Sequence, residues 1–390
     1  VDALDPLSKR MLSYASVLGR SFRRVVVEEL LRHEGLELDE ATLAQLSKFI
    51  EADGPLRYRF KNGLVCDVVY DSLAYRSRAR LHLAAGEAFE ALSTGDDTEA
   101  AMLSLHFSNA GDHGRAYRYA TIAADRADRT YAASEAIVHY ERALDAARRI
   151  DEVGDDELLR LLVALGEARF RAGLFDAALD TFRRASHVAA DDFVTRAEIH
   201  LRRARAREHA SSFSLALTET TRGRKFIEVA PAGERTDAVH AHLLACAATV
   251  QARQARSKQA LRTGSAAAEL AERCGETEAL ARSYHALWLA ATNTSTEGAV
   301  DLARRTFELY EAAGDLEGQA MMAMNLGVIA YYENDWDETI ERYREASDRL
   351  RQVGMLNNAA LSEANLGEVL VNQGRLDEAE PVLRDALRVM

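Results

Sequence analysis

Three residues of the sequence, His240, His242 and Cys246, are of the types that bind zinc. His242 and Cys246 lie four positions apart, so they would share one face of a helix, whereas His240 would point elsewhere. A structural zinc site needs about four ligands. We therefore expect packing roles for these side chains and no metal site in this chain.

Pairs of carboxylates are the second candidate for chemistry, because two of them can act as general acid and general base. Asp176 with Asp180 and Asp335 with Asp337 are such pairs, and both fall at expected hairpin turns or first turns of helices. Acidic side chains at those places complement the helix dipole and aid solubility. We favour this structural interpretation over a catalytic one.

Motifs of the common enzyme classes are missing from the sequence. A P-loop needs a glycine followed by a lysine and a hydroxyl residue, and none of the 22 glycines precedes a lysine. The patterns HExxH, CxxC and GxSxG do not occur either. We expect no catalytic residue and no cofactor here, so any ATPase activity would belong to another part of a longer protein.

Composition limits the classes of partner. The 390 residues carry a formal net charge of −13, which argues against wholesale binding to nucleic acid or an anionic membrane. The three cysteines are far apart and suit reduced packing residues of a cytoplasmic protein. No apolar run approaches ~18 residues, so we predict no transmembrane helix. Since the sequence opens at Val1 within a helical pattern, we expect a fragment of a longer chain.

A repeated spacing of small and bulky residues predicts helical hairpins. At offsets of 12, 16 and 19, Gly166 is followed by Ala178, Phe182 and Ala185, Gly327 by Thr339, Tyr343 and Ala346, and Gly367 by Ala379, Leu383 and Ala386. The small residue lets a second helix approach closely, and the later positions form a stripe that faces it. Such hairpins bury their apolar faces only by stacking, as tetratricopeptide-like repeats do.

The interval between repeats is near 40 residues, as between Gly327 and Gly367, and weaker repeats are expected at Ala204, Ala248 and Leu287. We predict an all-α fold in three parts. These are a winged-helix domain over residues 1–92, helical hairpins over 93–155, and a tetratricopeptide-like right-handed α-solenoid of about six repeats over 156–390. An irregular helical bundle is the alternative.

The first ninety residues have a different pattern. Helices are expected over 4–18, over 25–31 and from Asp39 through Ile50, followed by a strand over 56–60 and, after a turn, another apolar run over 64–70. Three to four helices with a short two-stranded wing predict a winged-helix fold. The presumed recognition helix, from Asp39 to Glu51, has a single basic residue, Lys48, so we do not expect it to read DNA.

Several segments resemble the bacterial STAND family of signal-transducing ATPases. They are YRFKNGLVCDVVYDSL at 58–73, followed by Arg78, Arg80, Leu81 and His82, with LDPLSKRML at 4–12 and LHFSNAGD at 105–112. The resemblance implies a non-catalytic sensor and scaffold that controls an upstream nucleotide-binding domain and an effector. An adenylate cyclase effector is expected, and a transcription regulator is the alternative.

The same resemblance suggests where the nucleotide-binding domain would dock. We expect Arg20, Arg23, Arg24 and Asn62 to form that docking surface. The family commonly has histidine where this sequence has Asn62, which would remove a side chain able to change its charge near neutral pH. The alternative is that Asn62 is a turn residue ahead of Gly63.

First helices of stacked hairpins line a concave wall, and residues flanking the small position project from it. Applied to this sequence, that rule selects an aromatic and methionine patch of Tyr284, Trp288, Met324, Tyr331 and Tyr332. It also selects the polar residues Arg160, Glu167, Arg171, Arg205, His209 and Arg253. Such side chains suit contact with a protein, a peptide or a small inducer. Burial between repeats is the alternative for Tyr284 and Met324.

Three functions follow as hypotheses. In the first, a ligand in the groove shifts the docking of residues 1–92, as expected of a sensor. In the second, groove and edges serve homo-oligomeric self-assembly of the longer protein. An intrinsic hydrolase or transferase is the third, and no residue constellation supports it.

Overall fold

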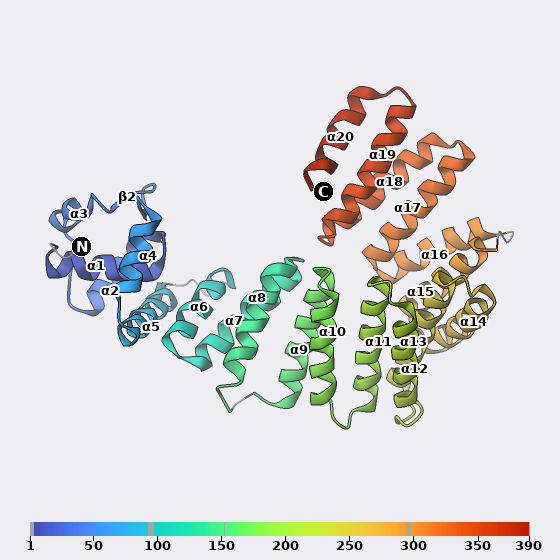
Figure 1. The fold of residues 1–390 in the computed structure, drawn as a ribbon, viewed down its shortest axis with the longest axis horizontal. Helices are drawn as coiled ribbons and strands as arrows, with labels where there is room; N and C mark the ends of the chain where they lie inside the picture. Colours follow the sequence, from blue (N-terminus) through green and yellow to red (C-terminus); the bar gives the residue numbers. More distant parts are fainter. Residues whose placement is uncertain (1–3, 93–96, 152, 295–297, 390) are drawn as a thin grey trace. The chain divides into compact units, whose positions relative to one another are not determined.

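The computed structural model describes residues 4–92, 97–151, 153–294 and 298–389, and these are mostly helical (Figure 1). The chain divides into two compact units, Val1–Leu161 (unit 1) and Leu162–Met390 (unit 2). The predicted all-α class is confirmed. The predicted boundaries after residues 92 and 155 stay predictions.

Unit 1 opens with a small domain of helices and strands. Its elements are α1 (Pro6–Leu18), β1 (Ser21–Arg23), α2 (Arg24–His33), α3 (Glu40–Leu46), β2 (Ile50–Ala52), β3 (Arg57–Phe60) and α4 (Gly63–Ser72). The strands form one antiparallel sheet in the order β1-β3-β2, in which Phe22 pairs with Tyr58 and Ile50 with Phe60. The helices enclose a core that includes Met11, and the whole is a winged helix, as predicted.

Three details of this domain differ from the sequence-based expectation. The third helix ends at Leu46, and Ile50 already belongs to β2. The apolar run over 64–70 lies in helix α4, because the side chain of Asn62 accepts a hydrogen bond from the backbone N–H of Leu64 at 2.9 Å and caps that helix. A third strand, β1, completes the sheet. Short apolar runs do not by themselves distinguish a strand from a buried helix.

The rest of unit 1 consists of longer helices. These are α5 (Tyr75–Leu92), the short 3-10 helix η1 (Asp97–Glu99), α6 (Ala100–Ala110), α7 (His113–Arg129), α8 (Ala133–Ala147) and the start of α9 (Asp155–Arg171). Helix α5 packs on α6, where a side chain on Gly86 would strike the ring of Phe107. Two buried histidines also meet there, with His82 Nδ1 3.0 Å from His106 Nδ1 and His82 Nε2 3.0 Å from the hydroxyl of Tyr70.

Unit 2 is built of consecutive helical hairpins. After the end of α9 follow α10 (Phe175–Val188), α11 (Phe193–His209), α12 (Phe213–Ile227), α13 (Glu234–Arg253), α14 (Ser257–Cys274), α15 (Thr277–Thr292), α16 (Ala299–Ala313), α17 (Leu316–Glu333), α18 (Trp336–Gln352), α19 (Leu356–Asn372) and α20 (Leu376–Val389). Each helix packs on its neighbours, as in a tetratricopeptide-repeat solenoid. None of the helices in the described ranges is both long and apolar enough to cross a bilayer.

The predicted close approach within hairpins is confirmed. A Cβ atom placed on Gly327 of α17 would lie 2.9 Å from the ring of Tyr343 on α18. The equivalent atom on Gly166 would overlap the ring of Phe182. Since real Cβ atoms almost never come so close to a neighbour, the glycines are required for the two helices of a hairpin to pack at this distance.

The weaker repeats also occupy their expected places. Ala204 of α11 is fully buried, and so are Ala248 and Ala260 on the two helices of the next hairpin. At the turns, Gly173 and Gly374 adopt φ of +74°, whereas Ser211 and Asn334 take similar positive φ values of 56° and 60° at other turns. Glycine is therefore the preferred but not the invariable residue at these hairpin turns.

Candidate functional site: a charged cavity in unit 2

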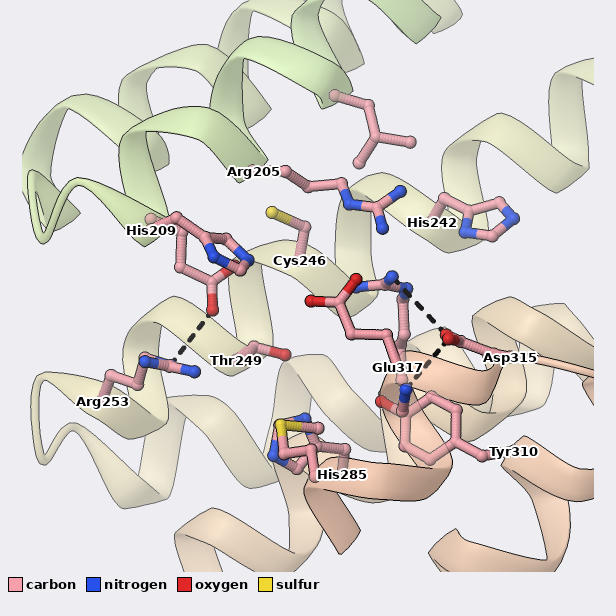
Figure 2. Close-up of a pocket in the computed structure, with 15 residues that line it drawn as sticks. Arg205, His209, His242, Cys246, Thr249, Arg253, His285, Tyr310, Asp315 and Glu317 are labelled. Atoms are coloured by element: carbon pink, nitrogen blue, oxygen red, sulfur yellow. Dashed lines mark hydrogen bonds and ion pairs between the residues drawn. The ribbon is translucent and has the colours of Figure 1, made fainter. Parts of the chain in front are cut away.

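A narrow cavity of about 70 Å³ lies within unit 2 (Figure 2). Polar side chains from five helices line it. Helix α11 contributes Arg205, Glu208 and His209, and α13 contributes His242, Cys246, Thr249 and Arg253. The others are Arg282 and His285 of α15, Tyr310 of α16, and Asp315 and Glu317 at the start of α17. Helices α11, α13, α15 and α17 are the first helices of four successive hairpins. Stacking of the hairpins therefore brings together polar residues that are more than a hundred positions apart in the sequence.

Helical periodicity places these residues on one face of each helix. On α13, His242, Cys246, Thr249 and Arg253 follow one another at intervals of four, three and four residues. On α15, Arg282 and His285 continue a series that begins with Glu278. Each first helix thus turns a polar stripe toward the cavity while its other faces pack against the rest of the stack.

Ion pairs neutralise most of the charges in the cavity. Arg253 Nε lies 3.1 Å from Glu208 Oε1. Arg282 lies between two carboxylates, with Nε 3.1 Å from Glu278 Oε1 and Nη2 3.8 Å from Asp315 Oδ2. Burial would raise the pKa of Glu278, but the positive charges of Arg282 and Arg205 outweigh burial and lower it.

Arg205 is paired much more weakly. Its Nη1 atom lies 3.9 Å from Glu278 Oε1, at the outer limit of an ion pair, and the guanidinium makes no hydrogen bond to any residue that the structure describes. The nearby charge of Arg282, followed by burial, lowers the pKa of Arg205. Even so, an arginine side chain remains protonated at neutral pH. Arg205 therefore presents donors that other groups in the cavity leave unused.

Glu317 is the acidic counterpart of Arg205. Its side chain extends into the middle of the cavity in Figure 2, and it forms neither an ion pair nor a hydrogen bond within the described ranges. Burial raises the pKa of Glu317, although Arg282 and Arg205 attract its negative charge. The cavity thus keeps one cation and one carboxylate without close partners, while its other charges are paired.

The histidines and the cysteine of the cavity are neutral at physiological pH. Burial, followed by repulsion from the arginines, lowers the pKa of His209 to about 4 and that of His285 to about 3. Burial also lowers the pKa of His242 and raises that of Cys246 to about 12. A thiol with so high a pKa is a poor nucleophile near pH 7, and such histidines are weak bases. These groups are better suited to hydrogen bonding than to proton transfer.

A second, more open cavity adjoins the first. It has a volume of about 560 Å³ and shares Leu201, Arg205 and His242 with the narrow cavity. Its lining carries five glutamates and three arginines, so its charge is negative overall. Arg205 therefore lies where the acidic outer cavity meets the narrow inner one.

Three polar residues that the sequence-based rule assigned to the concave wall lie near one another, and their role in binding stays a prediction. Arg205, His209 and Arg253 all line the narrow cavity, and Glu167 lines the outer one. Arg171 is exposed at the end of α9 and lines neither cavity. Arg160 belongs to unit 1, where it pairs with Asp125 and Glu157.

The aromatic and methionine patch is divided between core and surface. Trp288 is 7% exposed and lies in a hydrophobic cluster against which Tyr284 and Met324 also pack. Tyr331 packs edge-on against Trp336 at 5.4 Å between ring centroids, whereas Tyr332 is 80% exposed. A role of these five side chains in binding stays a prediction.

The predicted docking residues already have partners within unit 1. The closest ion-pair distances are 3.1 Å from Arg20 to Asp67, 2.6 Å from Arg23 to Glu99 and 2.6 Å from Arg24 to Glu28. Asn62 caps α4, as its alternative interpretation as a turn residue implies. Docking of a nucleotide-binding domain on this surface stays a prediction.

Metal binding was the remaining question from the sequence. Within the described ranges, no group of three or more histidine, cysteine, aspartate or glutamate side chains is arranged to hold a metal ion. His242 and Cys246 line the narrow cavity, and all three cysteines are free thiols.

The sequence-based rule missed Glu208, Arg282, His285 and Glu317 among the cavity residues. A detectable signal existed for two of them, because Glu278, Arg282 and His285 form an i, i+4, i+7 polar series on a first helix. Glu317 carries no such signal, since it lies in the first turn of α17, where acidic residues are common for helix-dipole reasons alone.

Comparison with known proteins identifies the repeat type. Residues 318–390 match the tetratricopeptide repeat model. The match covers most of α17 and the helices α18, α19 and α20 that follow it. No curated protein sequence matches the chain significantly.

Solved structures resemble the chain in fold. Aspartyl phosphate phosphatase F from Bacillus subtilis is 12% identical over 99% of this chain and 95% of its own, with a TM-score of 0.53. The Rap conjugation gene regulator of plasmid pLS20, solved with a Phr peptide, is 13% identical over 98% and 95%, with a TM-score of 0.51. A STAND protein with a tetratricopeptide repeat sensor from Pyrococcus horikoshii is 14% identical, with a TM-score of 0.43, and the chain spans 57% of its length.

Proposed function

We propose that unit 2 binds a peptide or an extended protein segment on the face formed by α11, α13, α15 and α17. One observation carries the proposal: charged and polar side chains from four successive hairpins converge on a single cavity that adjoins a larger, acidic one. Unpaired polar groups in a protein interior cost free energy, so packing alone does not explain Glu317 and the weakly paired Arg205.

The fold comparison supports a peptide as the ligand class. The Rap regulator of plasmid pLS20 is similar to this chain over nearly its whole length and was solved with a Phr peptide. Its low identity makes this an argument from fold, so the contacts must come from this chain's own residues. The neutral histidines and the high pKa of the Cys246 thiol favour recognition over catalysis as the role of the cavity.

Within a longer protein, the chain would act as sensor and scaffold. The STAND-like segments in residues 1–112 support a nucleotide-binding domain and an effector, an adenylate cyclase or a transcription regulator, outside this sequence. A ligand that binds one arrangement of the hairpins better than another would shift the population of that arrangement. Residues 1–92 would pass the change to the nucleotide-binding domain.

Retention of peptides by the immobilised chain tests the binding function. A synthetic hexapeptide library is passed over the wild-type chain and over Glu317→Arg, which places a longer side chain of opposite charge inside the cavity. Glu308→Arg is the matched control, because Glu308 lies on the exposed side of α16 and is 60% exposed. We expect enriched sequences on wild type and on the control, and none on Glu317→Arg.

Two outcomes would contradict the proposal. Enrichment that survives in Glu317→Arg would place the binding surface elsewhere on the chain. Absence of any enriched peptide, together with multimers that grow with protein concentration in light scattering, would favour self-assembly.

A further inference from the structure

The weakly paired Arg205 and the unpaired Glu317 define what a ligand in the cavity must offer. Arg253 is matched by Glu208, and Arg282 by Glu278 and Asp315. Arg205 and Glu317 remain, and they come from different hairpins. A ligand that satisfies both needs an anionic acceptor for the guanidinium and a donor for the carboxylate, held close together.

The size of the narrow cavity restricts the ligand further. The narrow cavity has about 70 Å³ of space, compared with about 560 Å³ in the outer one. We therefore expect the narrow cavity to receive one small polar group at the end of a chain. The outer cavity of about 560 Å³ has room for several residues next to that end.

The end of a peptide chain meets both requirements. A guanidinium has only donors, and its planar fork matches the two oxygens of a carboxylate. In the last residue of a peptide, the carboxylate and the backbone N–H are attached to the same Cα atom. We propose that Arg205 binds the terminal carboxylate of a peptide and that Glu317 accepts a hydrogen bond from the N–H of the same residue. This inference rests on the proposed peptide-binding function.

The carboxylate of Glu317 is not an obstacle to an anionic ligand. Burial makes its carboxyl group easier to protonate than an exposed glutamate, which lessens repulsion from an incoming carboxylate. Arg282 stands nearby as a second positive charge, already lowering the pKa of Arg205 through repulsion. An added negative charge relieves that repulsion, so binding of an anion removes an unfavourable interaction present in the empty cavity.

The outer cavity predicts which residues precede the carboxylate. Five glutamates against three arginines leave an excess of negative charge around the space next to Arg205. A lysine or arginine near the end of the peptide would complement that charge. The favoured ligand is therefore a short peptide with a free carboxylate and at least one basic residue just before it.

Three libraries test the role of the terminal carboxylate on the immobilised full chain. The first contains hexapeptides that lack Asp and Glu and have a free C-terminal carboxylate, and the second contains the same sequences as C-terminal amides. The third contains amides with one fixed Asp or Glu. Each is passed over wild type, Arg205→Gln and the control Arg305→Gln, whose arginine lies exposed on α16. Far-UV circular dichroism melting confirms that the variants are folded.

We expect at least tenfold enrichment from the acid library on wild type and on Arg305→Gln, and its loss on Arg205→Gln. Enrichment from the third library as well would retain carboxylate recognition by Arg205 and extend it to an Asp or Glu side chain. Equal enrichment from the second library on wild type and on Arg205→Gln would overturn carboxylate recognition while leaving peptide binding intact. If none of the libraries is enriched, both the carboxylate inference and the proposed peptide binding fail.

Discussion

Gly327 and Tyr343 lie against each other at the centre of one hairpin, where a Cβ atom on the glycine would come within 2.9 Å of the tyrosine ring. Tyr343 is buried and cannot move aside without disturbing its neighbours. We expect Gly327→Ala to lower the free energy of unfolding by about 1–2 kcal/mol, because overpacking outweighs the better helix propensity of alanine. Urea unfolding followed by circular dichroism measures this.

Gly114→Ala is the control for that substitution. Gly114 also lies in a helix, but its added Cβ would meet only an atom of Asp112, at 3.9 Å. Alanine should therefore be neutral or stabilise by up to about 1 kcal/mol. Equal losses in the two variants would show that close helix packing at Gly327 is not the cause.

Arg282→Gln removes the cation that lies between Glu278 and Asp315. We expect the free energy of unfolding to fall by about 1–2 kcal/mol at pH 7. Solvent screening limits the effect, because Glu278 is 43% exposed. Arg282 and Arg205 hold the folded-state pKa of Glu278 below its unfolded value, so this stabilisation exists above about pH 4.3 and is lost as pH falls. The difference between variant and wild type should therefore shrink toward pH 3 in urea unfolding, and a constant difference would contradict it.

Trp288 and Tyr332 were both expected on a binding surface, but their burial predicts different phenotypes. Trp288→Ala should lower the free energy of unfolding by about 3–5 kcal/mol, because it deletes a buried ring from the core around α15 and α17. Tyr332→Ala should change stability by less than about 0.5 kcal/mol, since its ring is 80% exposed. Thermal melting of both variants distinguishes them. A Trp288→Ala chain as stable as wild type would contradict its assignment to the core.

The buried histidine pair of unit 1 predicts a loss of stability in mild acid. Burial lowers the pKa of His82 to about 4 and that of His106 to about 3, below the value of about 6.5 in an unfolded chain. The stability that neutral rings contribute is therefore complete above about pH 6.5 and is lost as pH falls toward 4, by on the order of a few kcal/mol. Hydrogen exchange of α5 and α6 amides between pH 7 and 5 measures this loss.

A single substitution checks that the histidine pair is the cause. His106→Gln keeps hydrogen-bonding capacity but cannot gain a proton, so exchange in α5 and α6 should depend less on pH. His33→Gln is the control, because His33 is largely exposed beside Glu29. Unchanged pH dependence in His106→Gln would assign the acid sensitivity to other groups.

The repeat architecture was predictable because close helix packing leaves a strong local signature. Gly166, Gly327 and Gly367 recur with bulky residues at a fixed offset, and the structure places each pair in contact. The strands were less predictable. Ser21–Arg23 is too short to show alternation, and a capping contact from Asn62 decides that the apolar run after it is helical.

The candidate site was predictable only in part. Helical periodicity identifies Arg205, His209 and Arg253 as residues of concave walls, because orientation on one helix is a local property. The meeting of these residues with Glu317 depends on how successive hairpins stack, which no short window of sequence encodes. Exposure of Tyr332 and burial of Trp288 likewise depend on neighbouring hairpins.

Arg205 belongs to the hairpin of α11 and α12, and Glu317 to the third hairpin after it. In a stack whose hairpins pack mainly on their neighbours, small rotations at successive junctions add together, so the separation of these two side chains depends on the accumulated tilt. A ligand bound by both side chains would fix that tilt, and any bending of the stack would change the affinity for the ligand. Binding of a peptide in the cavity would thereby set the curvature of the stacked helices.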